Sequence, residues 1–524
     1  MIKAAALWAL AGWQDRKEGH PLASAQSQAP RADWLPTRAP RPLLTTSLAC
    51  ALSCISGCGI LEPKLPEAEP AIPVEWPLPP TTLAPVVPAS STAPAEGAAA
   101  DIGWRDFFVD QRLEELIARA LENNRDLRVA VLNVESVRAQ YRIQRASRVP
   151  WVNATGTLQR SGGSARLNPA GPGAGAGLVT ELYSVDLGIA GFELDLFGRV
   201  RNLSEAALQR YLAQEEVRRS AQLSLIATVA NAYLTLAADQ ELLRVSLATL
   251  KTYEDSYALT DRRHQFGAVS GLDVHQARVE VEAARSDVAF FSGTVAQDTN
   301  ALNLLIGAPV DATLLPETFD DSVTASSALP AGLPSEVLLR RPDVRQAEHV
   351  LRAANANIGA ARASFFPSIS LTGAIGTAST DLSDLFKGDS DTWNFTPSIN
   401  LPIFQGGRLR ANLDGAHAER DIALAQYERA IQGGFREVAD ALALTATLSA
   451  QRHAQEALVD AATSAERLSR ARYEAGRDSY LVQLDAQRTL YSALQGLIST
   501  RLAEENNRVV LYQVLGGGWN ERSP

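Results

Sequence analysis

Apolar residues recur at alternating spacings of three and four over long stretches of this chain. Between Ile226 and Tyr257 they form one stripe, which polar Gln240 and Glu254 interrupt. A sustained spacing of this kind indicates helices packed side by side, as in a coiled coil. Residues 199–261 contain no proline or glycine. They therefore predict one helix more than about 90 Å long, at about 1.5 Å per residue.

A second stretch, residues 408–473, predicts a similar long helix, and only Gly415 and the pair Gly433-Gly434 interrupt it. Shorter helices are predicted before and after each long one, at residues 113–148, 272–305, 335–365 and 481–515. Two of these short helices placed end to end match one long helix in length. We therefore expect each long helix to be flanked by two short ones.

Four segments alternate between apolar and polar residues, which predicts β-strands with one apolar and one polar face. They are residues 152–158, 183–189, 369–375 and 393–403, with a change of phase before Phe192. Their lengths suit tilted strands that cross a bilayer, although a half-buried soluble sheet would alternate in the same way. Four strands cannot close a membrane barrel, and an open edge is not viable in lipid. If the strands span a membrane, two, three or four chains must share about 8, 12 or 16 strands.

The same order of elements occurs twice. Asp126-Leu-Arg128 matches Asp343-Val-Arg345, and Ala146–Pro150 matches Ala363–Pro367, at a spacing of roughly 210 residues that is too long for a solenoid. Each copy reads helix, strand, loop, strand, long helix, turn, helix. The sequence predicts a first repeat at 104–310, a linker (equatorial region) at 311–334, a second repeat at 335–519 and a tail at 520–524.

Cys58 ends a short apolar run that two arginines precede, and it directly follows Ile55-Ser-Gly57. This context is typical of a bacterial lipoprotein signal, in which the cysteine is lipidated and becomes the first mature residue. Residues 1–57 are therefore predicted to be an N-terminal extension and signal peptide. Proline-rich residues 58–103 are predicted to be a lipid-anchored, extended tether. The alternative is a chance cysteine in a buried helix.

Composition narrows the classes of function. The net charge of −10 argues against a nucleic-acid partner. All three cysteines fall within the first 58 residues, so we expect no disulfide and no cysteine metal site in the mature chain. No apolar run of 18 residues follows Cys58, so no transmembrane helix is expected, although β-barrel strands would leave a much weaker signal.

No catalytic constellation stands out. The histidines after Cys58 are not spaced as metal ligands, and no nucleophile motif occurs. We expect no enzyme, no metal and no cofactor apart from the covalent lipid on Cys58. Two other classes stay open at this point. A lipid-anchored coiled-coil scaffold would not need the four alternating strands, and a secreted enzyme would need a nucleophile, acid/base or metal constellation.

Five stretches resemble the motifs of a known family. They are Leu339-Arg-Arg-Pro-Asp-Val-Arg-Gln-Ala-Glu348, Ala353-Ala-Asn-Ala-Asn-Ile-Gly-Ala-Ala-Arg-Ala-Ser-Phe-Phe-Pro367, Pro402-Ile-Phe-Gln-Gly-Gly-Arg408, Leu484-Asp-Ala-Gln-Arg488 and Leu515-Gly-Gly-Gly-Trp519. On these motifs the chain resembles the TolC-type outer-membrane efflux channels, in the OprM/NodT lipoprotein branch. The likeness covers about residues 104–519.

The resemblance implies a mainly α fold with a transmembrane β part. In this fold a homotrimer shares a barrel of about 12 strands, four from each chain, which a long α-helical barrel continues into the periplasm. It thus implies that the number of copies is three. It also implies an exit duct in the outer membrane of a Gram-negative bacterium. The partners would be a periplasmic adaptor (membrane fusion) protein, an inner-membrane RND-type transporter and outer-membrane lipids. Drugs, toxic compounds and metal ions all stay open as cargo.

The resemblance also assigns site residues. Leu481 and Asp485 would form the pore constriction, and one helical turn separates them, so both can face the axis. From the sequence alone, an ordinary surface carboxylate is the favoured interpretation of Asp485, and only the motif match reverses it. The two hairpin turns, 264–271 and 473–480, would dock the adaptor through Phe266, Gly267, Gly271, Gly476 and Ser479.

Overall fold

The computed structural model describes residues 61–70, 72–73, 75–77, 101–162, 179–319, 323–324 and 334–523. The chain divides into two compact units, Met1–Gly57 and Cys58–Pro524. The first unit, which holds the predicted signal peptide, lies outside the described residues, and so does Cys58. All that follows concerns the second unit.

Two helices of 67 residues each run the length of the helical part, α5 (Arg199–Gln265) and α9 (Arg408–Glu474). Each begins directly after a glycine in the left-handed region, Gly198 (φ 77°) or Gly407 (φ 87°), a conformation that favours glycine. The interior glycines do not interrupt α9. A Cβ atom at Gly434 would lie 2.9 Å from a methyl group of Leu338, so the glycine permits close packing there.

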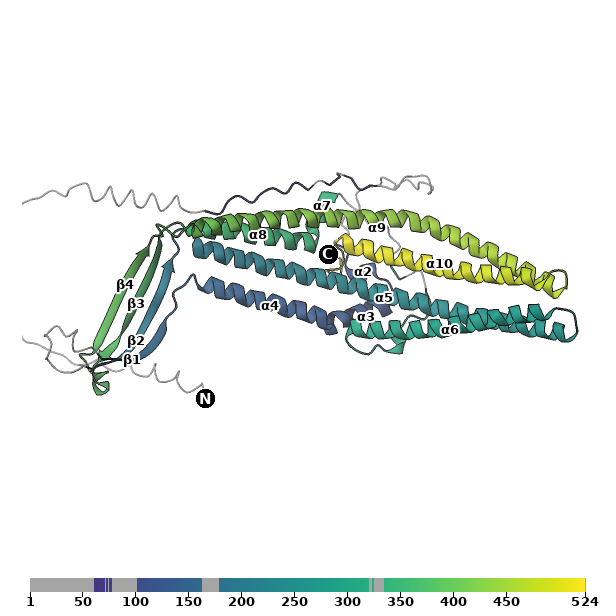
Figure 1. Cartoon of the computed structure of the whole chain (residues 1–524), viewed down its shortest axis with the longest axis horizontal. Coiled ribbons are helices and arrows are strands. Elements are labelled where there is room, and N and C mark those ends of the chain that lie inside the picture. The colour runs from purple at the N-terminus through teal and green to yellow at the C-terminus, as the bar shows by residue number, and fades with distance from the viewer. Residues whose placement is uncertain are drawn as a thin grey trace, which may run out of the picture. The chain divides into compact units, whose positions relative to one another are not determined.

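Shorter helices flank each long one, as the sequence predicts (Figure 1). Helices α4 (Arg125–Ala146) and α6 (Gly271–Ile306) lie along α5, and helices α8 (Pro342–Ala363) and α10 (Tyr480–Val514) lie along α9. Packing also joins α5 to α8 and to α10, so the two repeats form one continuous layer of helices.

Two predicted helices are each divided in two. The segment predicted at 113–148 comprises α3 (Gln111–Asn123) and α4, because the side chain of Asn124 caps α4 by accepting a hydrogen bond of 2.9 Å from the Leu127 N–H. The segment predicted at 335–365 comprises α7 (Pro334–Arg340) and α8. Pro342 begins α8, where its missing N–H costs nothing.

The end-to-end joints between short helices use equivalent bonds in the two repeats. The Asn124 amide donates to the carbonyl of Leu305 at the end of α6 (2.7 Å), and the Arg341 guanidinium donates to the carbonyl of Val514 at the end of α10 (2.9 Å). Both donors belong to the residue that precedes the next short helix. Each satisfies a carbonyl that has no partner within its own helix.

The four strands form one antiparallel sheet in the order β1-β2-β3-β4. Their bounds are β1 Asn153–Gly162, β2 Val179–Leu194, β3 Ser368–Ser379 and β4 Asp391–Asn400. The pair β2–β3 joins the two repeats, which leaves β1 and β4 at the edges. In Figure 1 the sheet lies beyond one end of the helices, opposite the hairpin turns.

The faces of the sheet are opposite in character. Leu187, Ile375 and Trp393 pair in one row across three strands and are 51, 65 and 79 % exposed. The other face is polar, with hydroxyl pairs such as Thr157 with Ser184 at 2.6 Å. This is the reverse of a soluble sheet, in which large apolar side chains turn away from solvent.

The phase change predicted before Phe192 is a β-bulge. The register of β2 against β3 shifts between Ile189 and Phe192, and Gly191 has a φ of 66°. The prediction for the last strand was too long, because β4 ends at Asn400 rather than at Ile403. Pro402 has no backbone N–H to donate to a ladder, and the chain turns there toward α9.

The largest apolar core lies at the middle of the helices. Phe107 of α2 (Trp104–Phe107) stacks on Tyr512 of α10 with ring centroids 4.0 Å apart. The Trp104 N–H donates to the carbonyl of Asn520 (3.1 Å), which fixes the start of the first repeat against the C-terminal tail. Short 3-10 turns, η3 (Ala312–Leu314) and η4 (Leu382–Asp384), complete the described elements.

Helix α5 is long and apolar enough to cross a membrane by length and mean hydropathy alone, although it contains no unbroken run of 18 apolar residues. Its most apolar stretch of 18 residues is 61 % buried within the protein. Residues of that stretch, such as Val229 and Leu236, belong to the central core. The apolarity of α5 is therefore accounted for by packing between helices.

Candidate functional site at the helical hairpin tips

The two hairpin turns have the same backbone geometry. Residues 266–270 join α5 to α6, and residues 475–479 join α9 to α10. Gly267 (φ 72°) and Gly476 (φ 69°) occupy equivalent left-handed positions, and each N–H donates to a carbonyl three residues earlier, at 2.8 and 2.9 Å. A Cβ atom at either glycine would meet nothing within 4 Å, so both turns are open to an approaching partner.

The turns differ in how they are held. Ser270 and Asp273 form a reciprocal capping box at the start of α6, which Gly271 begins. Ser479 makes no such side-chain bond at the start of α10. In the second turn Arg472 instead donates two hydrogen bonds to Asp478 (2.6 and 2.8 Å), and these bonds lower the pKa of that carboxyl below its usual range.

One arginine joins the first hairpin to the second. The Arg263 guanidinium donates to the carbonyls of Tyr473 and Glu474 (3.0 and 2.9 Å) at the end of α9, and it lies 4.5 Å from the centre of the Tyr473 ring. The Tyr473 hydroxyl is 3.1 Å from that of Thr260. Arg263 was not among the residues predicted for the site. Its only signal in the sequence is a pair of arginines in the last turn of α5.

The predicted constriction residues lie on one exposed side of α10. Leu481 is 58 % exposed and Asp485 is also exposed, whereas Gln483, Leu484 and Gln487 face inward. Within the described part of the chain no ion pair involves Asp485. The predicted docking residue Phe266 is 88 % exposed. These positions suit the predicted roles but do not test them, and both roles stay predictions.

The buried Gln487 and the exposed Arg488 of α10 tie this helix to the first hairpin. Gln487 donates to Ser256 (3.2 Å), and Arg488 forms an ion pair with Glu280 of α6. Arg488 ends the sequence motif that begins at Leu484. The motif therefore includes residues that hold the two hairpins together as well as Asp485 on the exposed side.

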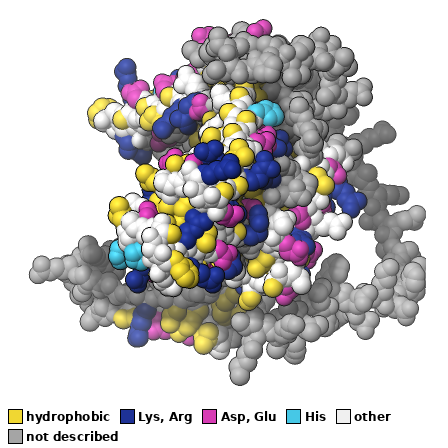
Figure 2. Space-filling view, turned by 90° about the vertical axis from the view of Figure 1, so that its right-hand side faces the viewer, with side chains coloured by type: hydrophobic (Ala, Val, Ile, Leu, Met, Phe, Trp, Pro, Cys, Tyr) yellow, Lys and Arg dark blue, Asp and Glu magenta, His cyan; other side chains and the backbone are white. Residues whose placement is uncertain are grey.

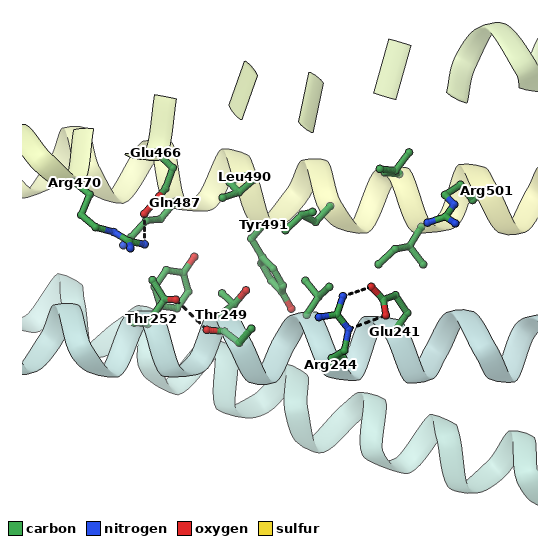
Figure 3. Close-up of a pocket in the computed structure, with 16 residues that line it drawn as sticks. Glu241, Arg244, Thr249, Thr252, Glu466, Arg470, Gln487, Leu490, Tyr491 and Arg501 are labelled. Atoms are coloured by element: carbon green, nitrogen blue, oxygen red, sulfur yellow. Dashed lines mark hydrogen bonds and ion pairs between the residues drawn. The ribbon is translucent and has the colours of Figure 1, made fainter. Parts of the chain in front are cut away.

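A groove of about 430 Å³ runs between α5 and α10 above the tips (Figure 3). Tyr491 projects from α10 toward α5, and its hydroxyl bonds Ser246 and Asp287 (2.9 and 3.0 Å). Glu241 pairs with Arg244 on α5, and Glu466 pairs with Arg470 on α9. Leu490 lies between these two ion pairs in the view.

The end of the unit that carries the tips is mixed in charge. Figure 2 looks at this end and shows Lys and Arg side chains interspersed with acidic and apolar ones. Across the described residues, no group of three or more His, Cys, Asp or Glu side chains is placed to hold a metal ion.

Known proteins share both the sequence and the fold of this chain. The family model described as "Outer membrane efflux protein" matches residues 116–308 and 333–517. The chain is 48 % identical to the toluene efflux pump outer membrane protein TtgC of Pseudomonas putida, over 91 % of this chain and 96 % of that one. It is 45 % identical to the cation efflux system protein CusC of Escherichia coli, over 80 % and 89 % respectively.

Among solved structures, the open state of the Neisseria gonorrhoeae MtrE outer membrane channel superposes with a TM-score of 0.79 at 39 % identity, over 89 % of this chain and all of that one. The predicted fold class, mainly helical with four strands from each chain, is confirmed, and so is the resemblance read from the motifs. This chain belongs to the outer membrane efflux protein family.

Proposed function

We propose that three copies of this chain form the outer-membrane duct of a tripartite efflux pump, which passes small molecules to the cell exterior. The family and the relatives named for toluene and cation efflux support this role. Those two names differ in cargo, so the proposal extends to small organic compounds and metal ions without choosing between them. As a channel the chain would carry out no bond-making chemistry.

One observation carries the proposal, namely a sheet that has two unpaired edges and an exposed apolar face. Strands β1 and β4 are the edges of the described sheet, and the large apolar side chains lie on an exposed face. In lipid each unpaired backbone group costs several kcal/mol, about 2–7 on general transfer scales. Pairing β4 of one copy with β1 of the next removes both edges.

The helical layer also has two exposed edges at which neighbouring copies could meet. Packing orders it as α4 or α6, then α5, then α8 or α10, then α9. Exposed apolar residues lie on both outer elements, among them Leu132 of α4, Phe290 of α6 and Ile422 of α9. The two edges differ, so the contact is head-to-tail, and such contacts close into a ring when the rotation is right.

Ile422→Asp should therefore weaken the trimer. It places a charge on the apolar edge of α9, where a partner would desolvate it. Native mass spectrometry of the detergent-extracted protein should show three copies for the wild type and a larger monomer fraction for the variant. Leu382→Asp, equally exposed in the β3–β4 connection, serves as the matched control. A stable monomer inserted in bilayers would contradict the architecture.

We also propose that Cys58 carries the lipid. The described part of the tether supports this, because the Leu61 carbonyl accepts a bond from Arg362 (3.2 Å), near the end of α8 and shortly before β3. Leu61, where the described part of the tether begins, therefore lies close to the level at which the sheet begins, as suits a lipid anchor on the segment before it. Farther on, Trp76 stacks on Phe435 of α9 (4.9 Å), so the tether follows the helices.

Cys58→Ala should abolish labelling by a palmitate analogue and leave the signal uncut by the lipoprotein peptidase. The barrel should still insert, because one lipid anchor adds little to a closed barrel. Metabolic labelling followed by gel fluorography checks this. Persistent labelling of the variant would place the lipid on another residue.

The adaptor is proposed to dock at the tips, with an inner-membrane RND-type transporter behind it. Gly476→Trp should impair efflux while leaving the trimer and its insertion intact, because a bulky side chain fills the open turn. Gly476→Asn controls for backbone strain, since asparagine tolerates the left-handed region. The comparison is made by resistance of cells to exported compounds. Normal resistance in the Trp variant would exclude docking at this turn.

Leu481 and Asp485 are proposed to form the constriction. In a trimer three leucines would make a narrow apolar ring that resists wetting, and three aspartates a ring that favours cations. Leu481→Ser with Asp485→Ala should raise conductance in planar bilayers, weaken cation preference and admit large antibiotics such as vancomycin. Unchanged conductance and selectivity in a folded double variant would move the constriction elsewhere, with the hairpin at 264–271 the next place to test.

A further inference from the structure

A hollow of about 440 Å³ lies beside the first third of α5, apart from the hairpin tips. Helix α5 contributes Glu216 and Arg219, the α7–α8 region contributes Arg340 and Arg345, and the segment after α10 contributes Trp519. The proposed duct uses none of these side chains. The hollow is therefore a separate feature that needs its own account.

The tether indicates which side of the helical layer the hollow occupies. Trp76 packs against a cluster that includes Val337 of α7 and Val514 of α10, and Ile72 packs against a cluster that includes Leu338 of α7. A tether that leads to a membrane anchor must run on the outside of the duct. The hollow is lined by Arg340 of α7 and by Trp519 after α10, close to the elements on which the tether packs. We therefore place it on the same, periplasm-facing side, a step that rests on the proposed function.

The arginines of the hollow are not all neutralised. Arg219 holds one oxygen of Glu216 at 2.7 Å, and Arg340 holds Asp101 at 3.1 Å. Arg345 has only a 3.7 Å contact with the same Glu216 oxygen, which is longer than a hydrogen bond. Its side chain is 45 % exposed, so its N–H groups are available to an incoming carboxylate.

Glu216 is a buried carboxylate, and one of its oxygens lacks a hydrogen-bond donor among the residues that the structure describes. Its side chain is 5 % exposed, and its Oε2 has no hydrogen-bond partner within the described part of the chain. A buried carboxylate oxygen without a partner is unfavourable, and an N–H donor would satisfy it. Trp519 and Leu339 add exposed apolar surface to the wall.

We propose that this hollow binds the head group of an α-amino acid, with its carboxylate on Arg345, its ammonium toward Glu216 and its apolar side chain against Trp519. Charges of both signs line the hollow, three arginines and the carboxylates of Glu216 and Asp101. An α-amino acid carries an ammonium and a carboxylate on the same carbon, so it can offer one group to Glu216 and the other to Arg345. The head group could belong to a free amino acid or to a residue linked to a larger molecule through its side chain.

The test measures binding to the intact, detergent-extracted wild-type trimer by calorimetry. The probes are L-phenylalanine, N-acetyl-phenylalanine, which lacks the ammonium, and phenylalaninamide, which lacks the carboxylate. Phenylalanine should bind at least about tenfold more tightly than either derivative, a difference of about 1.4 kcal/mol. Nε-acetyl-lysine has a free α-amino acid head group and a side chain that ends in an amide. It should compete with phenylalanine only if the hollow also binds residues that are linked to a larger molecule through their side chains.

Arg345→Gln should weaken phenylalanine binding about tenfold, and Trp519→Leu should weaken phenylalanine more than glycine. The matched control is Arg128→Gln, because Arg128 occupies the equivalent position in the first repeat and lies outside the hollow. Native mass spectrometry confirms that each variant is still a trimer.

Equal binding of all three probes, absence of binding, or an unchanged affinity in Arg345→Gln would overturn the proposal. A trimer that conducts ions but binds no amino acid would overturn only this inference. Failure to form a trimer would count instead against the proposed duct.

Discussion

The need to satisfy backbone hydrogen bonds governs this structure wherever its regular elements end. The sheet ends at β1 and β4 with two rows of unpaired N–H and C=O groups. The short helices end at mid-length with carbonyls that no residue of their own helix can reach. The second problem is solved within the chain, by Asn124 on the carbonyl of Leu305 and by Arg341 on that of Val514. The first cannot be solved by one chain, so the strands require neighbouring copies, which the proposed trimer supplies.

The joints also explain how one long helix and two short ones form a single unit. An uninterrupted 67-residue helix fixes the length, and the two short helices must meet beside it without leaving a gap. Gly307 at the end of α6 shows how close the meeting is, because a Cβ atom there would lie 2.6 Å from the Asn123 carbonyl. The apolar core around these joints, in which Phe107 stacks on Tyr512, restricts the movement of the helices at the same height along the layer.

The sequence predicted the elements well because the patterns extend over many residues. The period-two alternation even located the bulge before Phe192. Breaks and ends were harder to predict. The division at Asn124 depends on a single amide that meets a partner about 180 residues away, and the end of β4 depends on a turn toward α9. The contacts of Arg263 and Glu216 likewise join separate elements, so no local pattern contains them.

The two tips are not equivalent, although their turns are. The first hairpin is closed by its own capping box at Ser270. The second turn has the bonds from Arg472 to Asp478, but two carbonyls at the end of α9 take their donors from Arg263 of the neighbouring hairpin. The second hairpin carries Leu481 and Asp485, so the proposed constriction lies on the hairpin that depends on the other for its position. Outward movement of the second tip would break both bonds of Arg263 to carbonyl oxygens. A docked partner would therefore have to supply donors that replace them.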